Sequence, residues 1–417
     1  MVILLVYYNI LILSIFLDSW LRFDIMGSKN SADVTSTEAS AGNTLSIMEG
    51  VFFVKPFKTI EEQIILLKQR GLIIPDEDKA KKVLLSNNYY NIINGYSKYF
   101  PMRGDNYIEN TTFDEVTYLY LFDVELKQTF FRAILASELH IKSIFAHRFA
   151  EHFVSIPEAY LGKHCYDPGD PKDVARTIQK LKDIISSRNN DHSSSIYHYT
   201  TTYSYVPIWV LVNYLDFGHV RHMLQNTKIQ IQNNVAKDLL CFITQNIPAA
   251  STFPPQTMLA FLKNINEVRN VCAHNNRLIG FCCYADDKYF QPLHQPHNVS
   301  PNDNRRDVYS IYLSLQCFLT KAEYNILHNT LRKRMNDVSK HLHSINLNNI
   351  LKELGFPNDW HKHVKKVVQQ SQSMKNETKH PDLHSGYRDP RRRYHLFCGT
   401  HPRAKRAINL FYRHYKK

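Results

Sequence analysis

The segment VRNVCAHNNRL, from Val268 to Leu278, combines residue types that can move protons and bind phosphate. The imidazole of His274 titrates near neutral pH, so it can give or take a proton. The guanidinium of Arg269 keeps its charge and can donate two parallel hydrogen bonds to one phosphate. With the amide of Asn270 beside them, these groups suit attack by an RNA 2′-hydroxyl on its own phosphodiester, which needs proton transfer and a nearby cation. The same pattern is also typical of the solvated polar face of an amphipathic helix.

One helix is predicted to position these side chains, framed by Pro254 and Pro255 at its start and by Gly280 at its end. At about 100° per residue, one arc is apolar and is expected to face the core: Phe261, Ile265, Val268, Val271, Cys272, Leu278 and Ile279. The other arc is polar: Lys263, Asn266, Glu267, Arg269, Asn270, His274 and Arg277. Ala273 also lies on the polar arc, between Arg269 and His274, which are about 140° apart. Its small side chain leaves room for a ligand or another helix.

The rest of the chain carries the signals of further helices. Two capping boxes begin predicted helices, Thr59 with Glu62 and Thr112 with Glu115. We expect Gly71 to end the first helix. The second meets no Pro or Gly as far as His152, which makes it more than about 50 Å long.

Two more helical runs are indicated, one after the acidic residues 76–78 and one beginning with Pro207 at a first helical position. Residues 186–195 and 286–307 are predicted to be loops. Because strict two-residue alternation of apolar and polar side chains is scarce, the sequence predicts an all-α fold.

The composition bounds the partners and the compartment. The chain has 417 residues and a formal net charge of +13, which favours a polyanion, either nucleic acid or an anionic membrane surface. Seven cysteines without a CxxC pair argue against a disulfide framework and favour a reducing cytoplasm. The histidine pairs His219/His222 and His294/His297 lack the second ligand pair of a zinc site, so we expect no metal and no cofactor.

The N-terminus leaves two interpretations open. Residues 1–17 are an uncharged apolar run without the basic start or cleavage site of a signal peptide. They are either a membrane anchor or, if translation starts at Met26, part of a gene-start artefact. The polar stretch that follows, up to residue 47, is predicted to be a disordered linker.

The C-terminus is strongly basic. Residues 388–417 hold ten Lys and Arg residues against one acid, with aromatic residues between them. Cations contact phosphates and aromatic rings stack on unpaired bases, so this stretch suits RNA. The candidate RNA-binding residues are Arg391, Arg392, Arg393, Arg403, Lys405 and Arg406. A basic solubilising tail and an amphipathic helix on a membrane surface are the alternatives.

Longer blocks of the sequence resemble a known family. RNVCAH fits the motif of the HEPN ribonuclease superfamily, in which a histidine follows an arginine after four to six residues. The stretch KPFKTIEEQIILLKQRGLIIPDEDKAKKVLLSNNYYNIINGYSKYF resembles the N-terminal signature of the bacterial abortive-infection (Abi) family of the AbiD/AbiF type. YLYLFDVELKQTFFRAILASELHIKSIFAHRF is similar to the long helix of that family, HYTTTYSYVPIWVLVNYLDFGHVRHML to its central signature, and LKELGFPNDW to its closing one. The blocks follow in order over roughly residues 50–362.

The resemblance implies a HEPN-like helical bundle with a long helix and extra N-terminal helices, acting in anti-phage defence. It implies a homodimer joined near residues 263–280 that cuts RNA without metal, in some relatives together with a structured noncoding RNA. Carried over by position, Arg269 is the phosphate-binding cation, His274 the general acid or base, and Asn270 an orienting residue. Glu138, Glu267 and Arg277 are further orienting candidates, although Glu138 also fits a purely structural ion pair.

The predicted organisation has four parts. These are an apolar leader and linker at 1–47, an N-terminal helical segment at 48–110, a HEPN-like domain at 111–362 and a basic extension at 363–417. Two other functions stay open, a non-catalytic RNA-binding component of a defence ribonucleoprotein and a membrane-associated defence effector. The last requires residues 1–17 to be a genuine anchor.

Overall fold

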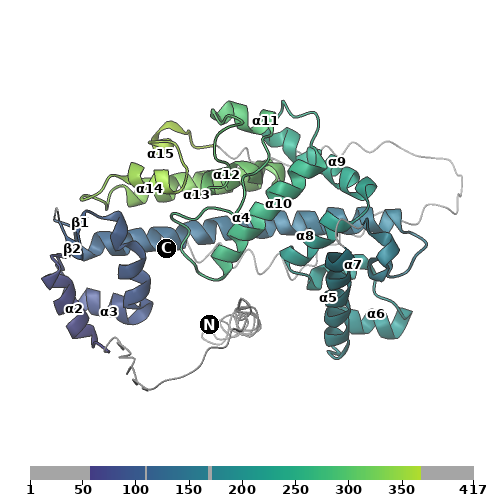
Figure 1. Ribbon diagram of the computed structural model, residues 1–417, viewed down its shortest axis with the longest axis horizontal. Coiled ribbons are helices and arrows are strands. Elements are labelled where there is room, and N and C mark those ends of the chain that lie inside the picture. The colour runs from purple at the N-terminus through teal and green to yellow at the C-terminus, as the bar shows by residue number, and fades with distance from the viewer. Residues whose placement is uncertain (1–56, 109, 168–170, 368–417) are drawn as a thin grey trace, which may run out of the picture. The chain divides into compact units, whose positions relative to one another are not determined.

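In the computed structural model the described residues from Lys58 onward belong to one compact unit. The structure describes residues 57–108, 110–167 and 171–367. The predicted apolar leader, the N-terminal linker and the basic residues from Arg388 onward lie outside these ranges. Within them, helices dominate and the strands form a single two-stranded sheet, which confirms the predicted all-α fold (Figure 1).

The long helix α4 runs from Phe113 to His152, which is 40 residues and about 60 Å at 1.5 Å per residue. Its predicted capping box is present. The hydroxyl of Thr112 accepts the N–H of Glu115 at 3.2 Å, and the carboxylate of Glu115 accepts the N–H of Thr112 at 3.1 Å. Glu115 also accepts the N–H groups of His343 and Ser344 at 2.7 Å each, so the start of α4 is tied to a distant loop.

The other long helices pack along α4, as Figure 1 shows for α10 (Pro255–Ala273) and α13 (Lys321–Val338). Helix α9 (Ile229–Asn246) also packs against it. The apolar stripe of α4 supplies buried aromatic rings to this core, among them Phe130 and Phe145. Burying one such ring stabilises the fold by about 1.5–3 kcal/mol, so the position of α4 among its neighbours is well determined.

The N-terminal part begins with α2 (Ile60–Gln69), which ends as predicted where Gly71 takes a φ of +82°. Helix α3 (Glu77–Asn87) begins at its N-cap Asp76. The helical run predicted after residues 76–78 does not continue, because Asn88 has a φ of 67°, a left-handed conformation that ends the helix. The next elements are a π-helical turn η1 (Tyr90–Asn94), a 3-10 turn η2 (Ser97–Tyr99) and the strands β1 (Met102–Arg103) and β2 (Asn106–Tyr107).

The helix predicted from Pro207 is also divided. Pro207 is the N-cap of the short helix α7 (Ile208–Leu211), the 3-10 turn η5 (Val212–Tyr214) follows, and α8 (Phe217–Asn226) begins after its N-cap Asp216. No side chain makes a capping hydrogen bond at the start of α7, whereas the carboxylate of Asp216 caps the start of α8. The sequence prediction missed this second helix start.

The remaining elements complete the described part. They are η3 (Ala159–Leu161), η4 (Lys163–Cys165), α5 (Pro171–Asn189), α6 (Ser195–Tyr203), α11 (Gln291–His294), η6 (Gln295–His297), α12 (Val308–Ser314), η7 (Leu315–Cys317), α14 (Leu347–Glu353) and α15 (Trp360–His363). The predicted loop at 186–195 is therefore helical at both ends, and the predicted loop at 286–307 contains α11 and η6.

Candidate functional site

The helix that carries Arg269 ends earlier than the sequence predicted. Helix α10 stops at Ala273, and His274 is its C-cap. Asn275 takes a left-handed φ of 54°, and the N–H of Asn276 donates to the carbonyl of Val271 at 3.0 Å. This is the hydrogen-bond pattern of a helix that closes on a left-handed asparagine. The prediction of one helix up to Gly280 was wrong, and residues 275–280 form a separate segment.

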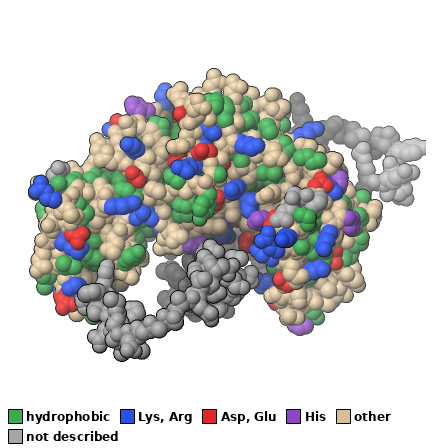
Figure 2. Space-filling view, viewed as in Figure 1, with side chains coloured by type: hydrophobic (Ala, Val, Ile, Leu, Met, Phe, Trp, Pro, Cys, Tyr) green, Lys and Arg blue, Asp and Glu red, His purple; other side chains and the backbone are tan. Residues whose placement is uncertain are grey.

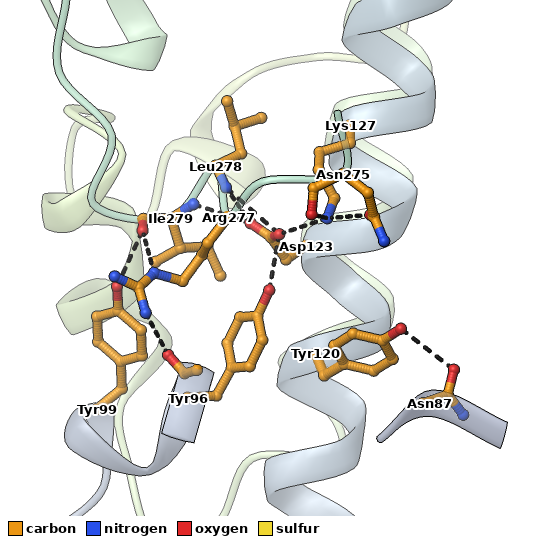
Figure 3. Close-up of polar contacts among 11 residues, drawn as sticks. Asn87, Tyr96, Tyr99, Tyr120, Asp123, Lys127, Asn275, Arg277, Leu278 and Ile279 are labelled. Carbon is orange, nitrogen blue, oxygen red and sulfur yellow. Dashed lines mark hydrogen bonds and ion pairs between the residues drawn. The ribbon is translucent and has the colours of Figure 1, made fainter. Parts of the chain in front are cut away.

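That segment is held by a buried acid of the long helix. Asp123 on α4 is fully buried, and its carboxylate accepts the N–H groups of Leu278 at 3.0 Å and Ile279 at 2.8 Å. The hydroxyl of Tyr96 donates to the same carboxylate at 2.8 Å. Figure 3 shows these contacts converging on Asp123. The chain immediately after RNVCAH is thereby fixed to the middle of the core.

A buried lysine completes this network. The Nζ of Lys127, one turn along α4 from Asp123, lies 3.3 Å from the Asp123 carboxylate. It also donates to the side-chain oxygen of Asn275 at 2.7 Å (Figure 3). Burial raises the pKa of Tyr96 far above its usual range, and Asp123 adds to the shift, so this hydroxyl stays a donor. The left-handed residue that ends α10 is thus bonded to α4 directly.

Arg277 has a structural position. Its guanidinium donates to the carbonyl of Gly95 at 2.6 Å and to that of Ile279 at 3.2 Å, and it lies 5.8 Å from the centroid of the Tyr99 ring. The hydroxyl of Tyr99 donates to Ile279 as well, at 2.9 Å, as Figure 3 shows. Arg277 therefore joins the segment after α10 to η1 and η2.

Arg269 belongs to α10 and interacts with residues of α4 and with the N-cap of α8. Its guanidinium carbon is 5.9 Å from the centroid of the Phe131 ring on α4. Its Nε is buried and has no hydrogen-bond partner among the described residues. Burial raises the pKa of Asp216, the N-cap of α8, but hydrogen bonds with His219 and the charges of His219 and Arg269 outweigh burial and bring the pKa to about 2. The cation is therefore half-buried beside an ionised carboxylate.

His274 is in a different environment. The residue is exposed, and its backbone N–H donates to the carbonyl of Asn270 at 3.0 Å. Asn270 is exposed too. The two residues share the last turn of α10, as the spacing predicted. The ring of His274 thus faces solvent, whereas Arg269 is partly enclosed by neighbouring helices.

The other two orienting candidates have partners of their own. Glu138 is buried on α4, and its carboxylate lies 2.7 Å from the Nζ of Lys142. It is two turns from Phe131, about 10 Å along the helix. The carboxylate of Glu267 accepts the N–H of Tyr284 at 3.0 Å. The candidate RNA-binding residues Arg391, Arg392, Arg393, Arg403, Lys405 and Arg406 lie outside the described residues.

Sequence reasoning missed Asp123, Lys127 and Asp216. A signal was present in the sequence. Asp123 and Lys127 lie at helical spacing from Leu119 and Leu126, on the apolar stripe of α4. Charged residues one turn apart on a core-facing stripe indicate a buried pair, since isolated charges are rarely buried. What the sequence could not indicate is the partner, which lies more than 150 residues away.

The histidines of the first pair have acidic partners of their own, and a cleft elsewhere on the molecule lies apart from RNVCAH. His219 pairs with Asp216 at 2.9 Å and His222 with Asp173 at 3.5 Å. Within the ranges that the structure describes, no group of three His, Cys, Asp or Glu side chains is arranged to hold a metal ion. A cleft of about 740 Å³ lies beside the C-terminal half of α4, and none of the six residues of RNVCAH lines it.

The fold and the site define an all-α protein whose long helix anchors the segment that follows an arginine–histidine motif. The model of the Abi-like protein family matches residues 82–280, and this match supports an Abi family protein. The matched segment runs from α3 through α4 and α10 and includes Asp123 and all of RNVCAH. The match also supports a role in abortive infection, a form of antiviral defence.

The other comparisons add no relative. No curated protein and no solved structure matches the chain. In the part of the chain that the structure describes, none of the helices is both long enough and apolar enough to cross a membrane.

Proposed function

We propose that this protein is a metal-independent endoribonuclease of the HEPN type that acts in abortive infection. The observation that supports this best is the exposed imidazole of His274 at the fixed end of α10, five residues after Arg269. The guanidinium of Arg269 interacts with Asp216 only from beyond ion-pair distance, and its Nε has no hydrogen-bond partner among the described residues, which supports its use in binding a phosphate.

The proposed chemistry uses these two side chains. The imidazole of His274 removes the proton of an RNA 2′-hydroxyl. The oxygen of that hydroxyl then bonds to the adjacent phosphorus. The bond from phosphorus to the 5′-oxygen breaks, and that oxygen takes up a proton from the imidazolium, which returns the ring to its neutral form. Arg269 stabilises the charge that builds up on the phosphate oxygens. The products are a 2′,3′-cyclic phosphate and a 5′-hydroxyl, and the proposed role of the Asn270 amide is to orient the phosphate.

The proposal includes a second copy of the chain. One chain carries a single RNVCAH segment, and its half-buried Arg269 and exposed His274 face different surroundings. A homodimer joined near residues 263–280 would bring a second arginine and histidine to the same RNA. The exposed side chains of Lys263, Asn270 and His274 are consistent with a contact on this side of α10.

The test is the substitution His274→Ala in the full chain. Because the ring is exposed at the C-cap, its loss opens no core cavity, and folding and RNA binding should be retained. RNA cleavage in the presence of EDTA should fall by about 10²–10⁴-fold, and protection against phage should be lost. His343→Ala, at another exposed histidine, is the matched control and should cut as the parent does.

A second candidate function is RNA binding without cleavage. It is favoured by the enclosure of Arg269 between Phe131 and Asp216, which also suits a structural cation. If His274→Ala protects against phage as well as the parent does, while the protein still binds RNA, this second function replaces the first.

A further inference from the structure

A second arginine lies on α8, which packs against α10, and none of the described carboxylates is within ion-pair distance of it. Arg221 on α8 is half-buried, and its guanidinium donates to the side-chain oxygen of Gln225 at 2.9 Å. It also lies 2.7 Å from the Nε2 of His222. Its Nε is buried and has no partner among the described residues. Among the residues that the structure describes, this cation therefore contacts neutral acceptors and has no carboxylate within ion-pair distance.

The neighbouring histidine is arranged so that it accepts. Because arginine can only donate, the Nε2 of His222 must be unprotonated to bond Arg221. The Nδ1 of His222 then carries the proton and lies 3.5 Å from the carboxylate of Asp173. That carboxylate accepts a hydrogen bond from the amide of Asn226 at 2.7 Å. Burial lowers the pKa of His222, and the charge of Arg221 lowers it further, which keeps the ring neutral. Arg221 is thus held in place by two neutral side chains, those of Gln225 and His222.

The position of Arg221 relates it to RNVCAH. Helix α8 packs against α10, and its N-cap Asp216 is the carboxylate that senses the charge of Arg269. Arg221 comes five residues later, which is about 7.5 Å along α8. Figure 2 shows Lys, Arg and His side chains gathered on the face of the molecule where α5 and α8 lie in Figure 1.

Partial burial of a guanidinium is costly, because it removes water from the charge. Burial lowers the pKa of Arg221, and the more distant charges of Asp173 and Glu267 offset only part of that effect. The solvent-facing N–H groups of such a cation form a planar fork that matches the oxygens of a phosphate. Arg334 on α13 shows the contrast, since its guanidinium pairs with the carboxylate of Glu125 at 2.6 Å.

We propose that Arg221 binds a phosphate of the RNA backbone next to the one that Arg269 contacts. This inference rests on the proposed function, because it assumes that the partner is RNA. Arg221 on α8 and Arg269 on α10 would contact successive phosphates of one RNA strand. The two contacts would direct that strand toward His274.

The experiment measures binding of a labelled single-stranded RNA of mixed sequence to the full chain carrying His274→Ala, so that cleavage does not interfere. Affinity is determined by fluorescence anisotropy between low and physiological salt. Adding Arg221→Gln should weaken binding by about tenfold or more. It should also make the slope of log affinity against log salt shallower by about 0.7, the value for one lost contact to single-stranded nucleic acid.

Two further variants separate charge from geometry and from general effects. Arg221→Lys should keep the slope but not the affinity, because it keeps the charge and loses the fork. Arg334→Gln is the matched control, an arginine of similar exposure whose charge is already paired, and should leave both affinity and slope unchanged. Unchanged melting temperatures would show that the variants fold.

The outcomes distinguish this site from the proposed activity. If Arg221→Gln binds with the affinity and slope of its parent, or if that parent binds no RNA at low salt, the phosphate site is wrong. If the slope changes as expected but the native chain cuts no RNA, the ribonuclease function is wrong while the site stands. If the native chain and Arg221→Gln cut and bind RNA equally well, the function stands and the site is wrong.

Discussion

The ring of His274 is exposed, and the position of the residue is fixed by hydrogen bonds of its backbone and of its neighbour Asn275. Its backbone N–H is bonded to Asn270, and the residue after it is bonded through its side chain to Lys127. A side chain that contributes little to stability can be changed for function without unfolding the protein. At this position the imidazole is therefore available for chemistry, whereas the same ring placed in the core would have a structural role.

His294 is such a core histidine. It is fully buried, and its Nδ1 accepts the N–H of Phe290 at 2.8 Å. Burial lowers its pKa to about 4, and the charge of Arg305 contributes. Above pH 6.5 the ring is neutral in both the folded and the unfolded protein. As the pH falls from 6.5 toward 4, only the unfolded chain takes up the proton, so the free energy of unfolding falls by up to about 3 kcal/mol.

His294→Gln tests this dependence, because an amide oxygen can accept the Phe290 N–H and does not titrate. Urea unfolding of the full chain at pH 7 and at pH 4.5 should show a smaller loss of stability for this variant than for the parent. The exposed His192 provides the control, and His192→Gln should follow the parent curve. Parallel curves for the parent and His294→Gln would contradict the role given to this ring.

At the scale of elements, the contact between α4 and the segment after α10 depends on one carboxylate. Asp123→Ala removes the acceptor of two backbone N–H groups and leaves the buried charge of Lys127 without its partner. Breaking a buried ion pair from one side costs about 3–5 kcal/mol. Urea unfolding should show a loss of this size, and amide exchange at Leu278 and Ile279 should become faster.

Two other variants frame that result. Asp123→Asn keeps an acceptor oxygen and should lose less stability than Asp123→Ala. Glu125→Ala breaks a half-exposed ion pair on the same helix, and such pairs contribute about 0–1 kcal/mol. Should Asp123→Ala prove no less stable than Glu125→Ala, the segment after α10 is not held through this carboxylate.

The same contacts explain which elements the sequence could predict. The starts of α2 and α4 are encoded within four residues by capping boxes, and both predictions are confirmed. The end of α10 depends on the left-handed conformation of Asn275. Asparagine tolerates this conformation but does not require it. What selects that conformation is the bond from Lys127, 148 residues away in the chain. Long-range contacts of this kind leave no periodic pattern in one sequence.

The candidate site was predictable to the same extent. RNVCAH alone located the arginine and the histidine on the last turns of one helix, because both lie within a single local element. The enclosure of Arg269 by Phe131 and Asp216 was not predictable, since it arises from the packing of α4 and α8 on α10. The partner of Arg277, the carbonyl of Gly95, likewise follows from packing. Lys142, in contrast, pairs with Glu138 one turn along the same helix, which is a local contact.

At the scale of the whole molecule, the proposed dimer can be tested by mass. Light scattering of the full chain should give twice the monomer mass. Ala273→Glu places a charge at the proposed contact, and because Ala273 is only partly buried this variant should fold. It should become monomeric and lose RNA cleavage, because a charge without a partner at an interface is costly.

Gln256→Glu adds the same charge to an exposed position at the start of α10 and serves as the control. It should stay dimeric. A monomeric parent, with RNA and without it, rules out the shared site. A dimeric Ala273→Glu that remains active places the contact between chains elsewhere.

Helix α4 also acts as a ruler between two places on the molecule. It presents Asp123 to the segment after α10 and, eight residues later, Phe131 to Arg269. One residue inserted between them would rotate Phe131 by about 100° and advance it by only about 1.5 Å, so the ring would turn away from the arginine while the Asp123 contact stayed intact. Seven inserted residues would nearly restore the direction but move the ring about 10 Å along the axis. This stretch of α4 should therefore tolerate substitutions far more readily than insertions or deletions.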